Sequence, residues 1–83
     1  MIDALTYNSL PIDEKVEILW RYGQYIETIS EKKYDVSLYG IDGLYIEVFY
    51  PANSNNVTDI RVIEDQSRLD RYALTVDPDH LFI

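Results

Sequence analysis

Residues Val36–Tyr50 read VSLYGIDGLYIEVFY. β-Branched and aromatic residues fill both halves of this stretch, and Asp42 and Gly43 separate the halves. An Asp-Gly dipeptide favours a two-residue type I′ turn, because both central residues of that turn need positive φ angles. The stretch therefore predicts a β-hairpin whose register is fixed by the turn.

This register decides which side chains share a face of the sheet, since successive residues of a strand point to opposite faces. The expected cross-strand pairs are Ile41 with Leu44, Tyr39 with Ile46 and Ser37 with Val48 on one face, and Gly40 with Tyr45, Leu38 with Glu47 and Val36 with Phe49 on the other. A further strand is expected over residues 57–63. Pairing Val48 with Ile60 gathers apolar residues, whereas a slip by one residue sets Glu47 against Ile60.

The first face of the predicted sheet is apolar and is expected to pack against the N-terminal helix. Its members are Tyr39, Ile41, Leu44, Ile46, Val48, Ile60 and Val62. The second face combines aromatic and apolar residues with an expected ion pair between Glu47 and Arg61. Its members are Val36, Leu38, Tyr45, Glu47, Phe49, Asp59 and Arg61.

Helical patterns flank the strands on both sides. Residues 2–10 predict a short helical turn that places Leu5 and Leu10 on the core. Residues 11–23 predict a helix with Pro11 at its first position and Gly23 as a left-handed C-terminal residue. Its expected core stripe is Ile12, Val16, Leu19, Trp20 and Gly23, with Ile18 on the opposite side.

The remaining elements are a first strand over residues 24–30 and a C-terminal helix. Ser67 is the expected N-cap of this helix, which runs to about Thr75 and buries Leu69 and Tyr72. The predicted fold is α+β, with an N-terminal helix, a four-stranded antiparallel β-meander and a C-terminal helix. All 83 residues are expected to form a single domain, 1–83.

Composition excludes several classes of function. The net charge of −8, with seven basic residues, argues against binding nucleic acid through its phosphates. No apolar run approaches the roughly 20 residues that span a bilayer, and the N-terminus lacks a signal-peptide pattern. The absence of cysteine removes disulfides and thiolate metal sites. A cytoplasmic location is the default expectation.

Catalytic patterns are also missing from the sequence. His80 is the single histidine, near Asp77 and Asp79 in the C-terminal tail, and no serine has a base nearby in the sequence. Gly40 and Gly43 belong to the hairpin, so they form no phosphate-binding loop. We therefore expect no catalytic residue, no cofactor and no metal site.

The second sheet face has two interpretations. In the first, the C-terminal helix or tail covers it, because small α+β domains place elements on both sides of a sheet, or its long side chains shield one another. In the second, it is an interface, where aromatic residues and arginine are enriched. The candidate binding residues are Leu38, Tyr45, Glu47, Phe49 and Arg61.

The leading functional hypothesis is a non-enzymatic interaction module that binds a protein partner or itself, most simply as a two-fold dimer. The alternative is a small-molecule-binding domain or weak enzyme, with a pocket between the sheet and the C-terminal helix. Tyr39, Tyr45 and Glu47 are the expected ingredients of that pocket.

The chain resembles a family of small uncharacterised proteins from Bacteroides-type bacteria. The residues that carry this resemblance are Leu10-Pro11, Glu14-Lys15, Leu19-Trp20, Gly23, Leu38-Tyr39, Asp42-Gly43, Tyr45-Ile46-Glu47-Val48, Tyr50, Leu69 and Tyr72. The resemblance implies the same fold and a bacterial cytoplasmic setting. It implies no activity, cofactor, partner or catalytic residue.

Overall fold

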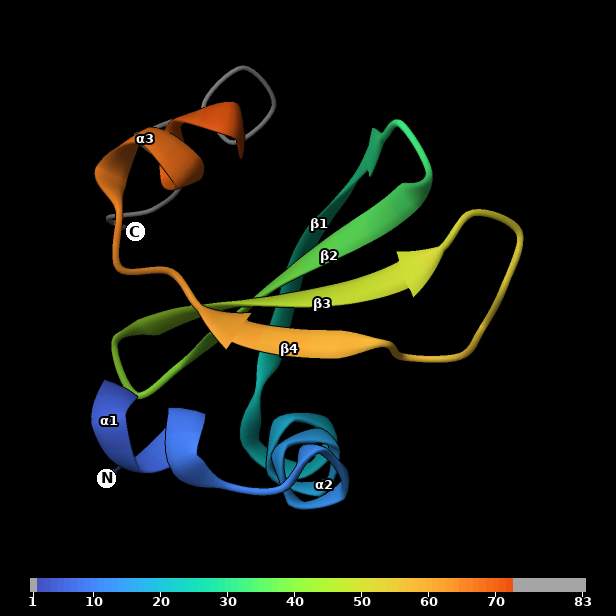
Figure 1. The fold of residues 1–83 in the computed structure, drawn as a ribbon. Coiled ribbons are helices and arrows are strands. Elements are labelled where there is room, and N and C mark those ends of the chain that lie inside the picture. The colour runs from blue at the N-terminus through green and yellow to red at the C-terminus, as the bar shows by residue number, and fades with distance from the viewer. Residues whose placement is uncertain (1, 73–83) are drawn as a thin grey trace.

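A computed structural model of the chain describes residues 2–72 (Figure 1). The elements are α1 (Ala4–Ser9), α2 (Ile12–Tyr22), β1 (Gln24–Glu31), β2 (Tyr34–Ile41), β3 (Leu44–Pro51), β4 (Asp59–Val62), α3 (Gln66–Leu69) and the 3₁₀ turn η1 (Asp70–Tyr72). The strands form one antiparallel sheet in the order β1-β2-β3-β4. Figure 1 shows α1 and α2 on one side of the sheet and α3 on the other. The predicted α+β fold is therefore confirmed.

The hairpin between β2 and β3 has the predicted turn and register. Asp42 and Gly43 adopt φ angles of 48° and 81°, as a type I′ turn requires. All the predicted pairs between these strands form, including Leu38 with Glu47. The expected register of β4 is also confirmed, because Val48 pairs with Ile60 and Glu47 lies opposite Arg61.

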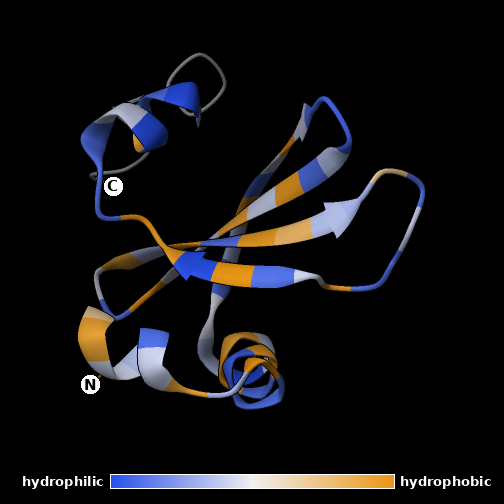
Figure 2. Ribbon diagram, in the orientation of Figure 1, coloured by the Kyte–Doolittle hydropathy of each residue, from blue (hydrophilic) through white to orange (hydrophobic). Residues whose placement is uncertain are grey.

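The first face of the sheet, called the helical face below, carries the main core. Figure 2 shows apolar and polar residues alternating along the strands, as expected for a sheet whose two faces differ. The buried members of this core are Tyr7, Leu19, Ile41, Ile46, Val48, Ile60 and Val62. The predicted packing of the N-terminal helices on this face is confirmed.

Helix α1 is rotated relative to its predicted orientation. Asp3 caps the helix by accepting a hydrogen bond from the Thr6 N–H at 2.8 Å. The helical phase that follows buries Tyr7, whose hydroxyl donates to the Lys15 carbonyl at 2.8 Å. Leu5 is 82% exposed, so its predicted place in the core is wrong. Leu10 packs against the core as expected.

Helix α2 points Leu19 at the sheet, and this orientation differs from the predicted stripe. Ile18 lies beside Leu19 and packs against the core instead of facing away from it, whereas Ile12 and Trp20 are 43% and 52% exposed. Gly23 is extended, with φ −78° and ψ 156°, so the predicted left-handed conformation is wrong. A Cβ atom there would lie 2.5 Å from the Leu19 carbonyl oxygen. Glycine fits this position because it has no Cβ to collide with that oxygen.

The outer edge of β4 is covered by hydrogen bonds from the chain itself. The Ile60 N–H donates to Asp59 Oδ1 at 2.9 Å, and the Ile60 carbonyl accepts from Lys15 Nζ at 3.4 Å. The Val62 N–H donates to Asn8 Oδ1 at 3.3 Å. Open N–H and C=O groups on an edge strand invite pairing with another chain. These bonds therefore disfavour strand addition at β4.

The C-terminal helix starts earlier than predicted. Asp65, not Ser67, is the N-cap, and its carboxylate accepts a hydrogen bond from the Ser67 N–H at 3.0 Å. Tyr72 is buried as expected, while the predicted continuation to Thr75 and the tail with His80 lie outside the described residues. Within residues 2–72, no helix has the length and apolar character needed to cross a bilayer.

Candidate functional site

The second sheet face is partly closed by the chain's own C-terminal segment. Val36, Leu38 and Glu47 are at most 3% exposed, and Tyr72 of η1 is 1% exposed. The Tyr72 hydroxyl donates a hydrogen bond to Glu47 Oε2 at 2.8 Å, which joins η1 directly to the centre of β3. Of the two interpretations of this face, covering by the C-terminal segment therefore holds for its inner part.

Glu47 is neutralised by Arg68 of α3. The Arg68 Nε lies 2.8 Å from Glu47 Oε1 and 2.9 Å from Oε2, and its NH2 lies 2.7 Å from Oε2. The ion pair expected between Glu47 and Arg61 is wrong, although the two residues are opposite each other in register. Arg61 forms its ion pair with Asp59 at 2.6 Å, on the same face of its own strand.

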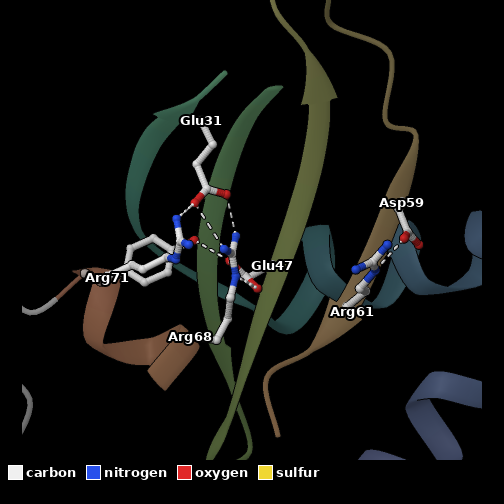
Figure 3. A network of polar contacts seen from close by, with 7 residues as sticks. Glu31, Glu47, Asp59, Arg61, Arg68 and Arg71 are labelled. Carbon is white, nitrogen blue, oxygen red and sulfur yellow. Dashed lines mark hydrogen bonds and ion pairs between the residues drawn. The ribbon is translucent and has the colours of Figure 1, made fainter. Parts of the chain in front are cut away.

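Arg68 bridges two carboxylates that come from different strands (Figure 3). Its two terminal nitrogens donate to both oxygens of Glu31, at 3.0 Å and 2.6 Å, while its Nε binds Glu47. Arg71 also donates to Glu31. Two carboxylates and two guanidinium groups thus balance in charge. We call Glu31, Glu47, Arg68, Arg71 and Tyr72 the Arg68 network.

The electrostatics of the network shift the pKa values of Glu31, Arg68 and Tyr72. Hydrogen bonds from Arg68, followed by the nearby charges of Arg68 and Arg71, hold the pKa of Glu31 below its usual value. Bonds to Glu47 and Glu31 raise the pKa of Arg68. Burial, and then the Glu47 carboxylate, raise the pKa of Tyr72, so its phenol remains a donor. These ion pairs and the Tyr72 hydrogen bond hold α3 and η1 on the sheet.

The outer part of the second face is more accessible. The Arg61 guanidinium carbon lies 5.1 Å from the centre of the Phe49 ring, and Tyr34 meets the same ring edge-on at 6.4 Å. Tyr34 is 45% exposed, and the Arg61 side chain is 68% exposed. We call Tyr34, Phe49, Asp59 and Arg61 the Phe49 surface. Figure 3 shows Arg61 and Asp59 apart from the Arg68 network.

The five predicted binding residues are therefore divided by the structure. Phe49 and Arg61 belong to the Phe49 surface, whereas Leu38 and Glu47 are buried. Tyr45 is half-buried and pairs with Gly40.

A hollow of about 370 Å³ lies where the alternative hypothesis expects a pocket. Glu31, Glu47, Phe49, Arg61 and Arg68 contribute to its lining. The expected combination of Tyr39, Tyr45 and Glu47 does not assemble there, because Tyr39 is on the helical face. Within residues 2–72, no group of three or more His, Cys, Asp or Glu side chains is placed to hold a metal ion.

Sequence reasoning did not identify Arg68 or Glu31 as partners of Glu47. A signal for Arg68 was present, because it precedes the expected core residue Tyr72 by four positions and so shares one helical face with it. No family model, no curated protein and no solved structure matches the chain.

Proposed function

We propose that this protein is a non-enzymatic interaction module that binds a protein partner through the Phe49 surface, in the simplest case a second copy of itself. The observation that carries the proposal is the accessible aromatic–arginine cluster of Tyr34, Phe49 and Arg61. Aromatic residues and arginine are the side chains that most often dominate binding energy at protein interfaces.

Two further features support binding through a face. The β4 edge is occupied by hydrogen bonds from Asn8, Lys15 and Asp59, which disfavours partner binding by strand addition. The inner carboxylate Glu47 is engaged by Arg68 and Tyr72, so its oxygens already have partners within the protein. Within residues 2–72, the Phe49 surface is the part of this face that we expect to meet another molecule.

Self-association is tested by size-exclusion chromatography with light scattering over a range of protein concentrations. We expect wild type to form a dimer as concentration rises, and Phe49→Asp and Arg61→Glu to remain monomeric. Arg61→Glu is expected to lower the stability of the fold less than Phe49→Asp does, because the Arg61 side chain is largely exposed. Tyr22→Asp, which alters a 68% exposed aromatic residue outside the surface, is the control and retains dimerisation. A wild type that stays monomeric at high concentration rejects the dimer version.

A different protein partner is tested by affinity capture from the native host with the same variants as baits. The proposal expects a protein that is retained by wild type and Tyr22→Asp and is lost with both Phe49→Asp and Arg61→Glu. Capture that is equal for all four baits rejects the Phe49 surface as the interface.

The hollow beside Arg68 favours small-molecule binding as the second candidate function. A ligand there must either compete with Arg68 for Glu31 and Glu47 or bind above them. Chemical shifts of the Arg68 and Arg61 side chains during a screen of small molecules distinguish this candidate from protein binding.

A further inference from the structure

A groove on the helical face lies beside α2, on the opposite side of the sheet from the Arg68 network. Its volume is about 560 Å³, within the range of small-molecule sites. The lining residues that matter here are Trp20 of α2, Thr28 of β1, Asp35 and Ser37 of β2, Tyr50 of β3 and Asn55 of the β3–β4 loop. Figure 1 shows this loop extending beyond the sheet at the end farthest from α1. We call this hollow the α2 groove.

The lining of the groove contains two aromatic residues, Trp20 and Tyr50, and Trp20 belongs to a larger cluster of rings. The Trp20 ring is half-exposed, and its centre lies 5.3 Å from the ring of Tyr39. Tyr25 meets Tyr39 edge-on at 5.5 Å and is also largely exposed. Exposed clusters of large rings are a feature of binding sites, because such rings supply apolar contact at little cost in conformational freedom.

The lining also contains polar side chains, including Thr28, Asp35 and Ser37. The Thr28 hydroxyl shares hydrogen bonds of 2.8 Å with Tyr25 and with Ser37, its buried neighbour on β2. Asp35 is half-buried and lies across the strands from Tyr50. The lining therefore combines aromatic rings with one carboxylate.

Charge indicates the kind of molecule that fits this lining. Asp35 is the one ionisable carboxylate in the described lining, and no Lys or Arg side chain contributes to it. The whole chain carries a net charge of −8, which attracts cations and repels anions. Aromatic rings also attract cations through their negative faces.

We infer that the α2 groove binds a small organic amine whose apolar end lies on Trp20 and whose ammonium group lies beside Asp35. This site is independent of the Phe49 surface, because the two lie on opposite faces of the sheet.

Three probes with the same apolar end and different head groups test the inference: phenylbutylamine, phenylbutanol and phenylbutyrate. Trp20 is the single tryptophan of the chain, so its fluorescence reports directly on the groove. Isothermal titration calorimetry provides an independent affinity. We expect saturable binding of the amine, about tenfold weaker binding of the alcohol, and still weaker binding of the carboxylate.

Two variants and two controls locate the binding. Asp35→Asn is expected to remove the preference for the amine over the alcohol, and Trp20→Leu to weaken both probes about tenfold by calorimetry. Glu17→Gln removes one exposed carboxylate outside the groove, and Tyr22→Ala removes one exposed ring outside it. Both controls are expected to bind the probes as wild type does.

The inference is overturned by three probes that bind with equal affinity, by an amine preference that survives Asp35→Asn, or by no saturable binding of the amine at millimolar concentration. Binding of a lysine-rich peptide is measured in the same way. Binding of this peptide without binding of phenylbutylamine also overturns it, because the groove would then recognise a protein segment. None of these outcomes depends on the oligomeric state that tests the Phe49 surface.

Discussion

The Nε atom of Arg68 lies 2.8 Å and 2.9 Å from the two carboxylate oxygens of Glu47. Arg61, the cross-strand neighbour of Glu47 on β4, forms an ion pair with Asp59 instead. The side chain of Glu47 is 4% exposed, and that of Arg68 is 25% exposed. A buried carboxylate is costly unless a cation pairs with it. Arg68 of α3 supplies that cation for Glu47. This relationship places the C-terminal segment on the second sheet face.

Acid is expected to weaken the fold through Glu31. Its pKa is lowered in the folded state, so its contribution to stability is present above the unfolded value, near 4.5, and is lost as pH falls through the lower folded value. In urea titrations at a series of pH values, Glu31→Gln should lose less stability than wild type between neutral pH and about pH 3.

Glu17→Gln is the control for this experiment. It removes an exposed carboxylate that pairs with Arg21, and the loss of such a pair changes stability by less than about 0.5 kcal/mol. A Glu31→Gln variant with the same acid sensitivity as wild type would contradict the role given to the Arg68 network.

Alkaline pH is expected to weaken the fold through Tyr7. Burial raises the pKa of Tyr7 from 10.0 to about 12, so the folded phenol keeps its proton after the unfolded one has lost it. The stabilisation is therefore present below pH 10 and decreases, on the order of 2 kcal/mol, as pH rises to 12. Tyr7→Phe should show a shallower loss than wild type in urea titrations across this range, whereas Tyr22→Phe, at an exposed tyrosine, should follow wild type. Equal slopes for all three proteins would count against this assignment.

The close approach at Gly23 predicts a steric effect of substitution. In Gly23→Ala the new Cβ would lie 2.5 Å from the Leu19 carbonyl oxygen and 2.9 Å from its Cδ1, and overpacking of this kind costs about 1–3 kcal/mol. Gly40→Ala is the matched control, because its nearest neighbour is Ile26 Cδ1 at 3.6 Å, an ordinary contact. Thermal or urea unfolding should show a loss of stability for Gly23→Ala alone.

The hairpin and its faces were predictable because their causes are local. Asp42 and Gly43 specify the turn, and the alternation that follows leaves one register that buries Ile46 and Val48 together. The phase of a short helix is less constrained by sequence. Asp3 and Asp65 each set a helix start through one side-chain hydrogen bond, and these bonds placed Tyr7 in the core and made Asp65, not Ser67, the cap.

The partner of Glu47 could not be deduced from register alone. Cross-strand position brings Arg61 near Glu47, but Asp59 lies two residues away on the same face of β4 and takes the Arg61 guanidinium. Arg68 reaches Glu47 only because α3 folds back over the sheet, and that return depends on contacts between distant parts of the chain. The α2 groove was missed for the same reason, since it joins residues of α2, three strands and a loop.

A double-mutant cycle on Glu47 tests the central claim, that Arg68 holds the C-terminal segment on the second sheet face. Glu47→Gln, Arg68→Ala, Arg61→Ala and the two double variants are compared by urea unfolding. Arg68→Ala should cost about 3 kcal/mol or more, because it leaves a buried carboxylate without its cation. Arg61→Ala should cost about 0–1 kcal/mol, as expected for an exposed pair.

The account predicts a coupling energy of about 2 kcal/mol or more between Glu47 and Arg68, and one near zero between Glu47 and Arg61. Coupling of Glu47 to Arg61 with none to Arg68 would contradict it.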